Sequence, residues 1–251
     1  MTRNLLILGG TLEARELGAA IAARGWQGTL SLAGRVERPL RQPLPQRVGG
    51  FGGVEGLRSY LRDNAITHVI DATHPFAAQM SRNAVAACSA ARVPLLALSR
   101  APWVAQEGDL WVHVADIPGA VAALDGAPRR VMLAIGRQNL PAFAACPQHF
   151  YLLRLVDAPS APLPLPRAHV IVDRGPFTAE QDQALMAAHQ IDLIISKNAG
   201  GTGAYAKIIA ARQLGLPVIM IDRPHVPPRH EVHDVAGVMA WLDHAGTDLG
   251  V

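Results

Sequence analysis

The sequence predicts an α/β protein with two doubly wound parallel sheets in tandem and a cleft between them. Short apolar runs typical of buried strands alternate with helical patterns along the chain. Glycine-containing turns follow several of these runs, and the second half of the chain repeats the order and spacing of the first. Such a repeat indicates two copies of one supersecondary plan, and alternation of strands with helices favours parallel sheets. Ligands of such sheets usually bind at the carboxyl ends of the strands.

Length and composition restrict the class of protein. The chain has 251 residues, of which 50% are hydrophobic, so it can bury the core of one large or two small domains. Its net charge of +3 is too small to argue for nucleic acid, and no basic run is interleaved with aromatic residues. The excess of arginine suits a small molecule with several negative charges. We therefore expect a small-molecule partner and no nucleic acid.

The cysteines and the N-terminal segment indicate a reducing compartment. Cys88 and Cys146 lie far apart and outside any CxxC motif, as expected of buried thiols rather than of a disulfide or metal site. The apolar run near the N-terminus is too short for a signal peptide, and no run approaches the ~18 residues that span a membrane. We expect a cytoplasmic protein that does not insert into membranes.

The first strand, turn and helix have the order of a nucleotide-binding unit. An apolar run at 4–8 is followed by Gly9, Gly10 and Thr11 and then by a helical pattern. The first turn of such a helix suits a phosphate group. The turn lacks the full GxGxxG motif, so it is weak evidence by itself.

The end of the second predicted strand favours NADP over NAD. That strand covers 29–32, includes Ser31 and leads to Arg35. In dinucleotide-binding folds an acidic residue at this place binds the ribose 2′-hydroxyl, whereas an arginine accepts a 2′-phosphate. Arg38 and Arg41 follow closely, so an exposed loop arginine without a ligand is the alternative.

Two further segments bring candidate ligand groups close to strand ends. The segment 49–53 has four glycines around Phe51, which lets backbone approach a ligand closely and lets the ring cover a planar group. A plain tight turn is the alternative there. The predicted strand at 68–71 ends in a polar segment that contains Thr73 and His74. Because such strand ends bind ligands in open α/β sheets, we expect His74 to contact one.

The internal repeat divides the chain into two domains. The two halves align without a gap over 55–71 and 180–196. We expect a first domain at 1–115 and a second at 116–251. Two segments resemble each other closely enough that either can complete either sheet: 111–126 and 231–246.

The stretch 193–214 combines a strand, a glycine-rich turn and a helical pattern. The first turn of such a helix has unpaired N–H groups and partial positive charge, which suits an anionic group. The chain has 23 lysine and arginine residues, of which only Lys197 and Lys207 are lysines, and both lie here. A compact ammonium is not equivalent to a guanidinium as a donor. We expect Lys197 to take part in a site and Lys207 to lie on the helix surface.

Together these segments resemble the precorrin-6A reductase and cobalt-precorrin-6A reductase family of cobalamin biosynthesis. The resemblance implies two Rossmann-like domains and an NADPH-dependent reduction of one double bond of a tetrapyrrole, precorrin-6A, to give precorrin-6B, with a possible handover to the next pathway enzyme. The sequence does not distinguish a metal-free from a cobalt-containing substrate. The motifs that carry the resemblance span nearly the whole chain: ILGGTLEARELGAAI, SLAGR, GGFGG, DATHPFA, AIGRQNL, RGPF and SKNAGGTGAYAKI.

Carried over to this sequence, the resemblance implies a cofactor site in the first half and a substrate site in the second. The cofactor-binding residues are expected to be Gly9, Gly10, Thr11, Ser31, Arg35, Gly50, Phe51, Gly52, Gly53, Thr73 and His74. The substrate-binding residues are expected to be Arg100, Arg137, Arg174, Lys197, Asn198, Gly200, Gly201 and Thr202. Cationic donors and a helix N-terminus match the many carboxylates of the tetrapyrrole. The proton that accompanies the hydride has four candidate sources: His74, Lys197, Tyr205 and water.

Other interpretations have weaker support. Tyr205 and Lys207 are two positions apart, not four as in short-chain dehydrogenases, and point to different helix faces. The segment GGTG is not followed by Gly-Lys-Ser/Thr, which excludes a phosphate-loop NTPase. His225, His230 and His233 match no standard metal-site spacing, so we expect no metal. A non-catalytic NADP-binding sensor is the remaining alternative, and it would need no cations in the second half.

Overall fold

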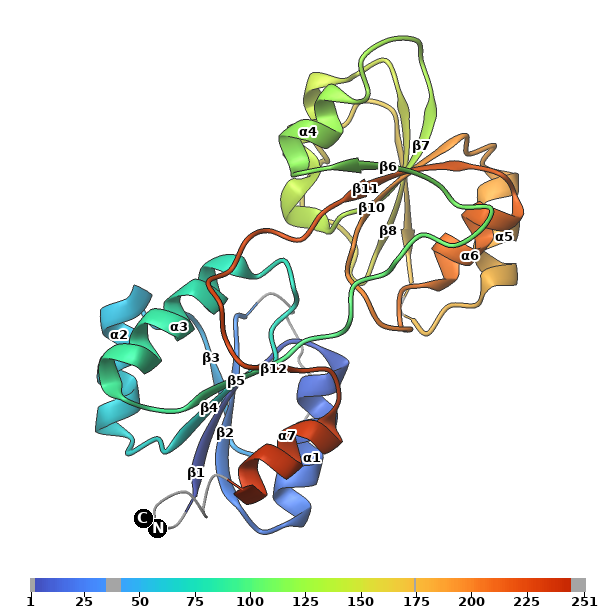
Figure 1. Ribbon diagram of the computed structural model, residues 1–251. Coiled ribbons are helices and arrows are strands. Elements are labelled where there is room, and N and C mark those ends of the chain that lie inside the picture. The colour runs from blue at the N-terminus through green and yellow to red at the C-terminus, as the bar shows by residue number, and fades with distance from the viewer. Residues whose placement is uncertain (1–2, 35–41, 174, 245–251) are drawn as a thin grey trace. The chain divides into compact units, whose positions relative to one another are not determined.

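The structure, a computed structural model, describes residues 3–34, 42–173 and 175–244. The chain forms two compact units, and each contains one six-stranded, all-parallel sheet (Figure 1). The first unit comprises Met1–Ala101 together with His225–Val251, and the second comprises Pro102–Pro224. The predicted fold class, two doubly wound parallel α/β sheets, is confirmed.

The sheet of the first unit has the strand order β12-β5-β4-β1-β2-β3. Helices α1 and α7 pack on one face, and α2 and α3 pack on the other (Figure 1). The central strand β1 carries four buried apolar side chains and pairs with β2 and β4, which makes it the hub of the core. Its strands are β1 (Asn4–Leu8), β2 (Gln27–Leu32), β3 (Gln46–Val48), β4 (His68–Asp71), β5 (Leu95–Leu98) and β12 (Glu231–Val232), and its helices are α1 (Leu12–Ala23), α2 (Gly53–Asp63), α3 (Ala78–Ala91) and α7 (Val235–His244).

The sheet of the second unit has the order β6-β11-β10-β7-β8-β9. Helices α5 and α6 cover one face of this sheet, and α4 lies on the other (Figure 1). Its strands are β6 (Leu110–Val114), β7 (Arg130–Ala134), β8 (Phe150–Leu155), β9 (Ala168–Val172), β10 (Leu193–Lys197) and β11 (Pro217–Ile221), and its helices are α4 (Ile117–Ala122), the 3-10 helix η1 (Arg137–Ala145), α5 (Ala179–Ala188) and α6 (Ala206–Gln213).

The two sheets have corresponding strand orders, as the internal repeat predicts. In both, the strand that begins the repeat lies third from one edge: β1 in the first sheet and β7 in the second. Burial follows the same correspondence, since Leu61 and Met186 are each 1% exposed and Ile66 and Ile191 are each 6% exposed. Equivalent positions therefore occupy equivalent places in two copies of one plan.

The domain boundary differs from the prediction. The segment after β5 leaves the first sheet and adds β6 beside β11, and the segment after β11 returns to add β12 beside β5. The contiguous division into 1–115 and 116–251 therefore does not match the compact units. Local sequence could not decide this point, because the two exchanged segments resemble each other and only long-range pairing separates them.

Candidate functional site

The turn after β1 has the geometry of a close-approach loop. A Cβ on Gly9 would lie 2.6 Å from Cδ1 of Leu30, so a larger residue there would displace a core side chain. Gly10 has a φ of 123°, a conformation that other residues rarely adopt. A Cβ on Gly10 would meet no protein atom within 4 Å, so the space above this turn is open.

Thr11 joins the turn to the neighbouring strand and begins α1. Its Oγ1 accepts a hydrogen bond from the N–H of Ala14 at 3.1 Å, which caps the helix. The same hydroxyl donates to the carbonyl oxygen of Ala72, just beyond β4, at 2.9 Å. The predicted phosphate-binding turn and the predicted Thr73–His74 segment thus lie at adjacent strand ends of one sheet.

Ser31 and Phe51 are joined by Arg47, a residue that sequence reasoning missed. The guanidinium donates to Oγ of Ser31 at 2.7 Å and to the carbonyl oxygens of Gly49 and Gly50 at 2.9 and 3.0 Å. Its Cζ lies 3.8 Å from the ring centroid of Phe51, a cation–π contact. The glycine-rich loop is therefore held by one arginine of β3, a strand too short to be predicted.

The remaining predicted residues of this loop lead into α2. Gly52 is the N-terminal flanking residue of that helix and has a left-handed conformation, and Gly53 is the first helical residue. Phe51 also packs edge-on against Tyr60, with ring centroids 5.1 Å apart. Arg35 lies outside the residues that the structure describes, so its predicted contact with a 2′-phosphate stays a prediction.

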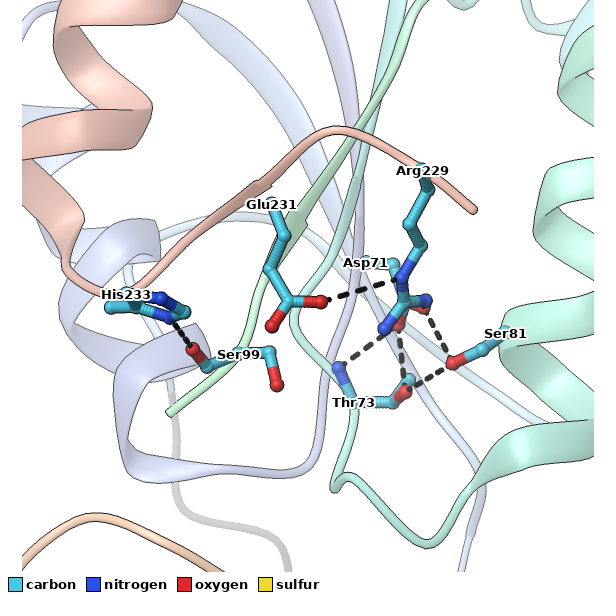
Figure 2. A network of polar contacts seen from close by, with 7 residues as sticks. All are labelled: Asp71, Thr73, Ser81, Ser99, Arg229, Glu231 and His233. Carbon is cyan, nitrogen blue, oxygen red and sulfur yellow. Dashed lines mark hydrogen bonds and ion pairs between the residues drawn. The ribbon is translucent and has the colours of Figure 1, made fainter. Parts of the chain in front are cut away.

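A buried carboxylate organises the end of β4 (Figure 2). Asp71, 2% exposed, accepts hydrogen bonds from the N–H and hydroxyl of Thr73 at 3.1 and 2.7 Å and from the hydroxyl of Ser81 at 2.6 Å. Arg229, from the segment that returns to β12, donates to the same carboxylate. A second acid, Glu231, lies 3.8 Å from Nε of this arginine. Thr73 is thus held rigidly, and Arg229 is a second residue that sequence reasoning missed.

His74 follows this network in the same loop. Its Nδ1 accepts a hydrogen bond from the N–H of Phe76 at 3.2 Å, and the two rings pack with centroids 5.8 Å apart. The side chain is partly exposed at the carboxyl-terminal edge of the sheet, the place predicted for it. Its contact with a ligand stays a prediction.

Arg100, predicted to bind substrate, pairs within the first unit. Its Nε lies 3.2 Å from Oε1 of Glu13, in the first turn of α1. The second carboxylate oxygen of Glu13 is buried and has no hydrogen-bond partner among the described residues. The ion pair connects the end of β5 to the start of the helix that follows the glycine turn.

In the second unit, Asn198 anchors the segment after β10. Its amide oxygen accepts from the N–H of Trp103 at 2.8 Å, and its amide nitrogen donates to the carbonyl oxygen of Trp103 at 2.9 Å. The indole Nε1 of Trp103 donates to the carbonyl oxygen of Gly201 at 2.6 Å. The side chain of Asn198 is 6% exposed, and both its amide oxygen and its amide nitrogen are hydrogen-bonded, which gives it a positioning role in the loop.

A turn separates the glycine-rich loop after β10 from helix α6. Helix α6 begins at Ala206, and a separate turn that includes Thr202 precedes it. Lys197 is the last residue of β10 and is half-buried. Arg137, exposed at the start of η1, donates to the hydroxyl of Ser160 at 3.2 Å. Arg174 lies outside the described residues, and its predicted substrate contact stays a prediction.

Lys207 is buried, so its prediction as a helix-surface residue is wrong. The side chain is 7% exposed, and its Nζ donates to the carbonyl oxygen of Ala204 at 2.5 Å. Burial lowers the pKa of this ammonium from its ordinary 10.5 to about 8; the carboxylate of Asp182 opposes this shift and Arg154 adds to it. The helical pattern could not show this burial, because it results from packing of α6 against α5 and β11.

Tyr205, a candidate proton source, packs beside Trp103 with ring centroids 5.5 Å apart. Its hydroxyl accepts a hydrogen bond from Arg212 at 2.8 Å, and that arginine also forms a bidentate ion pair with Asp109. A phenol hydroxyl that accepts from a guanidinium keeps its own proton available for donation. The role of Tyr205 as a proton source stays a prediction.

The described part of the chain contains neither a cluster of metal ligands nor a membrane-spanning helix. No group of three or more His, Cys, Asp or Glu side chains in residues 3–34, 42–173 and 175–244 is arranged to hold a metal ion. Within the same residues, no helix has the length and apolar character needed to cross a lipid bilayer.

Comparisons with known proteins identify the family. Residues 4–243 match the family model described as precorrin-6x reductase CbiJ/CobK. The chain is 58% identical over 252 residues to the precorrin-6A reductase of Rhodobacter capsulatus, covering 100% of each chain, and 28% identical over 236 residues to the cobalt-precorrin-6A reductase of Priestia megaterium, covering 88% of this chain and 91% of that protein. A solved structure of CobK precorrin-6A reductase superposes with a TM-score of 0.93 at 57% identity over 97% of each chain. The chain therefore belongs to the precorrin-6x reductase family CbiJ/CobK.

Proposed function

We propose that this protein reduces one ring double bond of precorrin-6A with NADPH, giving precorrin-6B in cobalamin biosynthesis. The observation that carries the proposal is the 58% identity to a precorrin-6A reductase over the full length of both chains. The loop geometry adds to it, because the first unit has an open glycine turn at a helix start and the second has cationic side chains at a strand end. One domain for the cofactor and one for the substrate is the simplest division.

In this proposal the cofactor's pyrophosphate lies against Gly9, Gly10 and Thr11, where the open space above Gly10 admits a phosphate close to the backbone. Arg35 would bind the 2′-phosphate that distinguishes NADPH from NADH. When bound, NADPH supplies a hydride from its nicotinamide ring. The chain's own residues orient the ring through the rigid Phe51 loop and the Thr73–His74 loop, which fixes the direction of attack.

The substrate would be held through its carboxylates. Lys197, Arg137 and Arg174 provide positive charge, and charge-assisted hydrogen bonds to carboxylates are the strongest that side chains form. Asn198 acts indirectly, since it fixes the loop between Lys197 and the glycines by bonding Trp103. This role adds to the direct substrate contact expected from the sequence, because the amide oxygen and the amide nitrogen can each form one more hydrogen bond.

We further propose that the natural substrate is metal-free precorrin-6A. The relative named precorrin-6A reductase is 58% identical to this chain, whereas the relative named cobalt-precorrin-6A reductase is 28% identical. Substrate preference usually follows the details of the binding loops, which diverge with overall identity.

An anaerobic assay tests the proposal. Purified protein is mixed with precorrin-6A or its cobalt complex, and oxidation of NADPH and of NADH is followed separately at 340 nm, with mass spectrometry of the product (~2 mass units heavier on addition of two hydrogens). We expect turnover with NADPH and the metal-free substrate. NADPH binding without oxidation in the presence of either substrate would instead identify a non-catalytic sensor. Lys197→Met tests whether the cofactor and the substrate bind to different units, since this variant should weaken turnover and leave NADPH affinity unchanged.

A further inference from the structure

The two units differ at two equivalent buried positions. Leu57 lies four positions before Leu61, and Asp182 lies four before Met186, the equivalent residue of the second unit. Likewise, Ala84 lies ten positions before Pro94, and Lys207 lies ten before Pro217. Leu57 and Ala84 are both 0% exposed and belong to the apolar core of the first unit. The second unit therefore has a buried acid and a buried base where the same fold needs only apolar side chains.

These charged residues line a small cavity under the glycine-rich loop. The cavity has a volume of about 160 Å³ and is lined by residues that include Ala134 of β7, Arg154 of β8, Phe177, Asp182 and Lys207. A space of this size accommodates several water molecules or the edge of a planar ring. Ala134 ends the strand next to β10, so the cavity lies at the carboxyl-terminal end of the sheet.

Only one of the two carboxylate oxygens of Asp182 has a hydrogen-bond partner among the described residues. Asp182 lies in the first turn of α5, which begins with a reciprocal cap between Thr178 and Gln181. Nη1 of Arg154 lies 2.6 Å from its Oδ1, and the guanidinium packs 3.5 Å from the ring centroid of Phe177. The other oxygen, Oδ2, is buried and has no hydrogen-bond partner among the described residues. A buried carboxylate oxygen needs a donor, so the cavity should contain one.

Stability alone does not account for this arrangement. Replacing buried ionic groups by apolar ones of similar volume is often neutral or stabilising. The first unit demonstrates that this fold is completed by Leu57 and Ala84 at the same places. The acid and base in the second unit are therefore best explained by chemistry in the cavity.

We propose that Lys207 is the proton donor of the reduction, with Asp182 and Arg154 as the residues that position it; this role rests on the proposed function. The reduction of a carbon–carbon double bond consumes one hydride, which carries both electrons, and one proton. A C–H bond forms at one carbon with the hydride, and an N–H bond of the Lys207 ammonium breaks as its proton forms the second C–H bond. The neutral amine is then reprotonated from solvent water in the cavity.

The electrostatics of the cavity suit this role. A lysine whose pKa is about 8 is mostly protonated at neutral pH and yet releases its proton more readily than an ordinary lysine. The charged groups that face it are Asp182 from α5 and Arg154 from β8, while the lining residues of β7 are uncharged. Trp103 lies on another side, with its ring centroid 5.0 Å from Nζ.

The experiment compares Lys207→Arg and Lys207→Met with the wild type. Arginine keeps the positive charge but does not release a proton at usable pH. Lys207→Arg would therefore still bind a substrate carboxylate but could not donate a proton. We expect kcat to fall by about 100-fold or more in both variants, as is typical when a general acid is lost, with KM for precorrin-6A and Kd for NADPH nearly unchanged. In the wild type, kcat should fall above a pH of about 8, and Asp182→Asn should move that limb to lower pH. Arg167→Met, at an exposed arginine of the same unit, is the control and should retain wild-type kinetics.

An NMR titration and a double variant distinguish loss of the proton donor from loss of folding, and the titration does not depend on activity. Because Lys197 and Lys207 are the only lysines, lysine labelled with carbon-13 at Cε gives two side-chain signals, and Lys197→Met assigns them. One signal should titrate near pH 8 in the wild type and shift to lower pH in Asp182→Asn. The double variant Asp182→Leu with Lys207→Ala copies the first unit and should remain folded but lose turnover.

The outcomes separate this inference from the proposed function. Absence of turnover in the wild type with any substrate and cofactor overturns the proposed function and the role of Lys207 with it. If the wild type turns over and Lys207→Arg keeps the full kcat, the proton-donor role is overturned and the proposed function stands. The same holds if the Lys207 variants show only a higher KM for precorrin-6A. The latter result would mean that Lys207 holds a substrate carboxylate.

Discussion

Arg229 donates to the buried carboxylate of Asp71, although 158 positions separate the two residues in the chain. Figure 2 shows the two side chains meeting at the end of β4. The acid side chain is 1% exposed and the arginine side chain 13% exposed, so neither charge is well hydrated. Asp71 also orders Thr73, which belongs to the predicted cofactor site. The returning segment at 225–244 therefore helps to complete the polar network of the first unit as well as extending its sheet.

Removing the arginine should destabilise the first unit and weaken cofactor binding. Arg229→Met leaves the Asp71 carboxylate buried without its cation, and loss of one partner of a buried pair typically costs about 3–5 kcal/mol. We expect a lower midpoint in urea unfolding and a higher Kd for NADPH. Arg62→Met is the matched control, because Arg62 and Asp63 form an exposed pair with side chains 69% and 58% accessible, worth about 0–1 kcal/mol. Equal effects of the two variants would contradict the assigned role of Arg229.

Gly10→Ala should separate cofactor binding from folding. The φ of 123° makes alanine unfavourable by about 1–3 kcal/mol, and the added methyl group projects into the space assigned to a pyrophosphate. We expect NADPH affinity to fall at least tenfold in isothermal titration. Gly18→Ala is the control, because its Cβ would lie 3.9 Å from Leu44 in ordinary contact within α1 and alanine is favoured in helices. NADPH affinity that is unchanged in Gly10→Ala would place the cofactor elsewhere.

Asn198→Asp should destabilise the loop that follows β10. Aspartate keeps the acceptor for the N–H of Trp103 but loses the donor to its carbonyl oxygen and buries a charge. A buried acceptor left unpaired costs about 1–3 kcal/mol, and Asn198→Ala should fall in the same range. Asn83→Ala, which removes only an exposed bond to Gln79, should change stability by less than about 0.5 kcal/mol. Urea unfolding followed by tryptophan fluorescence measures all three, and similar stabilities would refute the anchoring role.

The sequence was sufficient for the parts of the fold that local patterns encode. The run at 4–8 and the glycines after it were predicted because buried strands and turns have short-range signals. The exchange of the segments at 111–126 and 231–246 was not, because nearly identical local patterns pair with different sheets. Pairing between distant strands depends on the whole chain. Local sequence patterns therefore do not determine which of the two sheets each segment joins.

The candidate site was predicted unevenly for the same reason. Thr73 and His74 were found because they follow a strand in the order that open α/β sheets use for ligands. Arg47 and Arg229 were missed, since their importance comes from partners that only the folded chain brings within hydrogen-bond distance. Lys207 was misjudged as exposed because helical spacing does not reveal which face a neighbouring helix covers.

The buried Lys207 should also produce a specific dependence of stability on pH. Its pKa is about 8 in the folded protein and 10.5 ordinarily, so between these values the unfolded chain holds more protons on this residue. The free energy of unfolding contributed by Lys207 therefore rises as pH increases from about 8 to 10.5, by about 3 kcal/mol at most. Below pH 8 both states are protonated, and the folded state bears the full cost of the buried charge.

Comparison with Lys207→Met isolates this contribution from other titrations. Burial raises the pKa of Cys88 to about 12, with the Asp71 carboxylate adding to the shift, so the folded state holds more protons on that thiol above about pH 9 and its contribution declines there. Both proteins share that decline, and it cancels in their difference. Urea unfolding from pH 7 to 10.5 should show Lys207→Met more stable than the wild type at pH 7 and the gap closing as pH rises. A gap that does not change with pH would mean that the lysine is hydrated in solution and titrates normally, since only a group with different pKa values in the two states links protonation to folding.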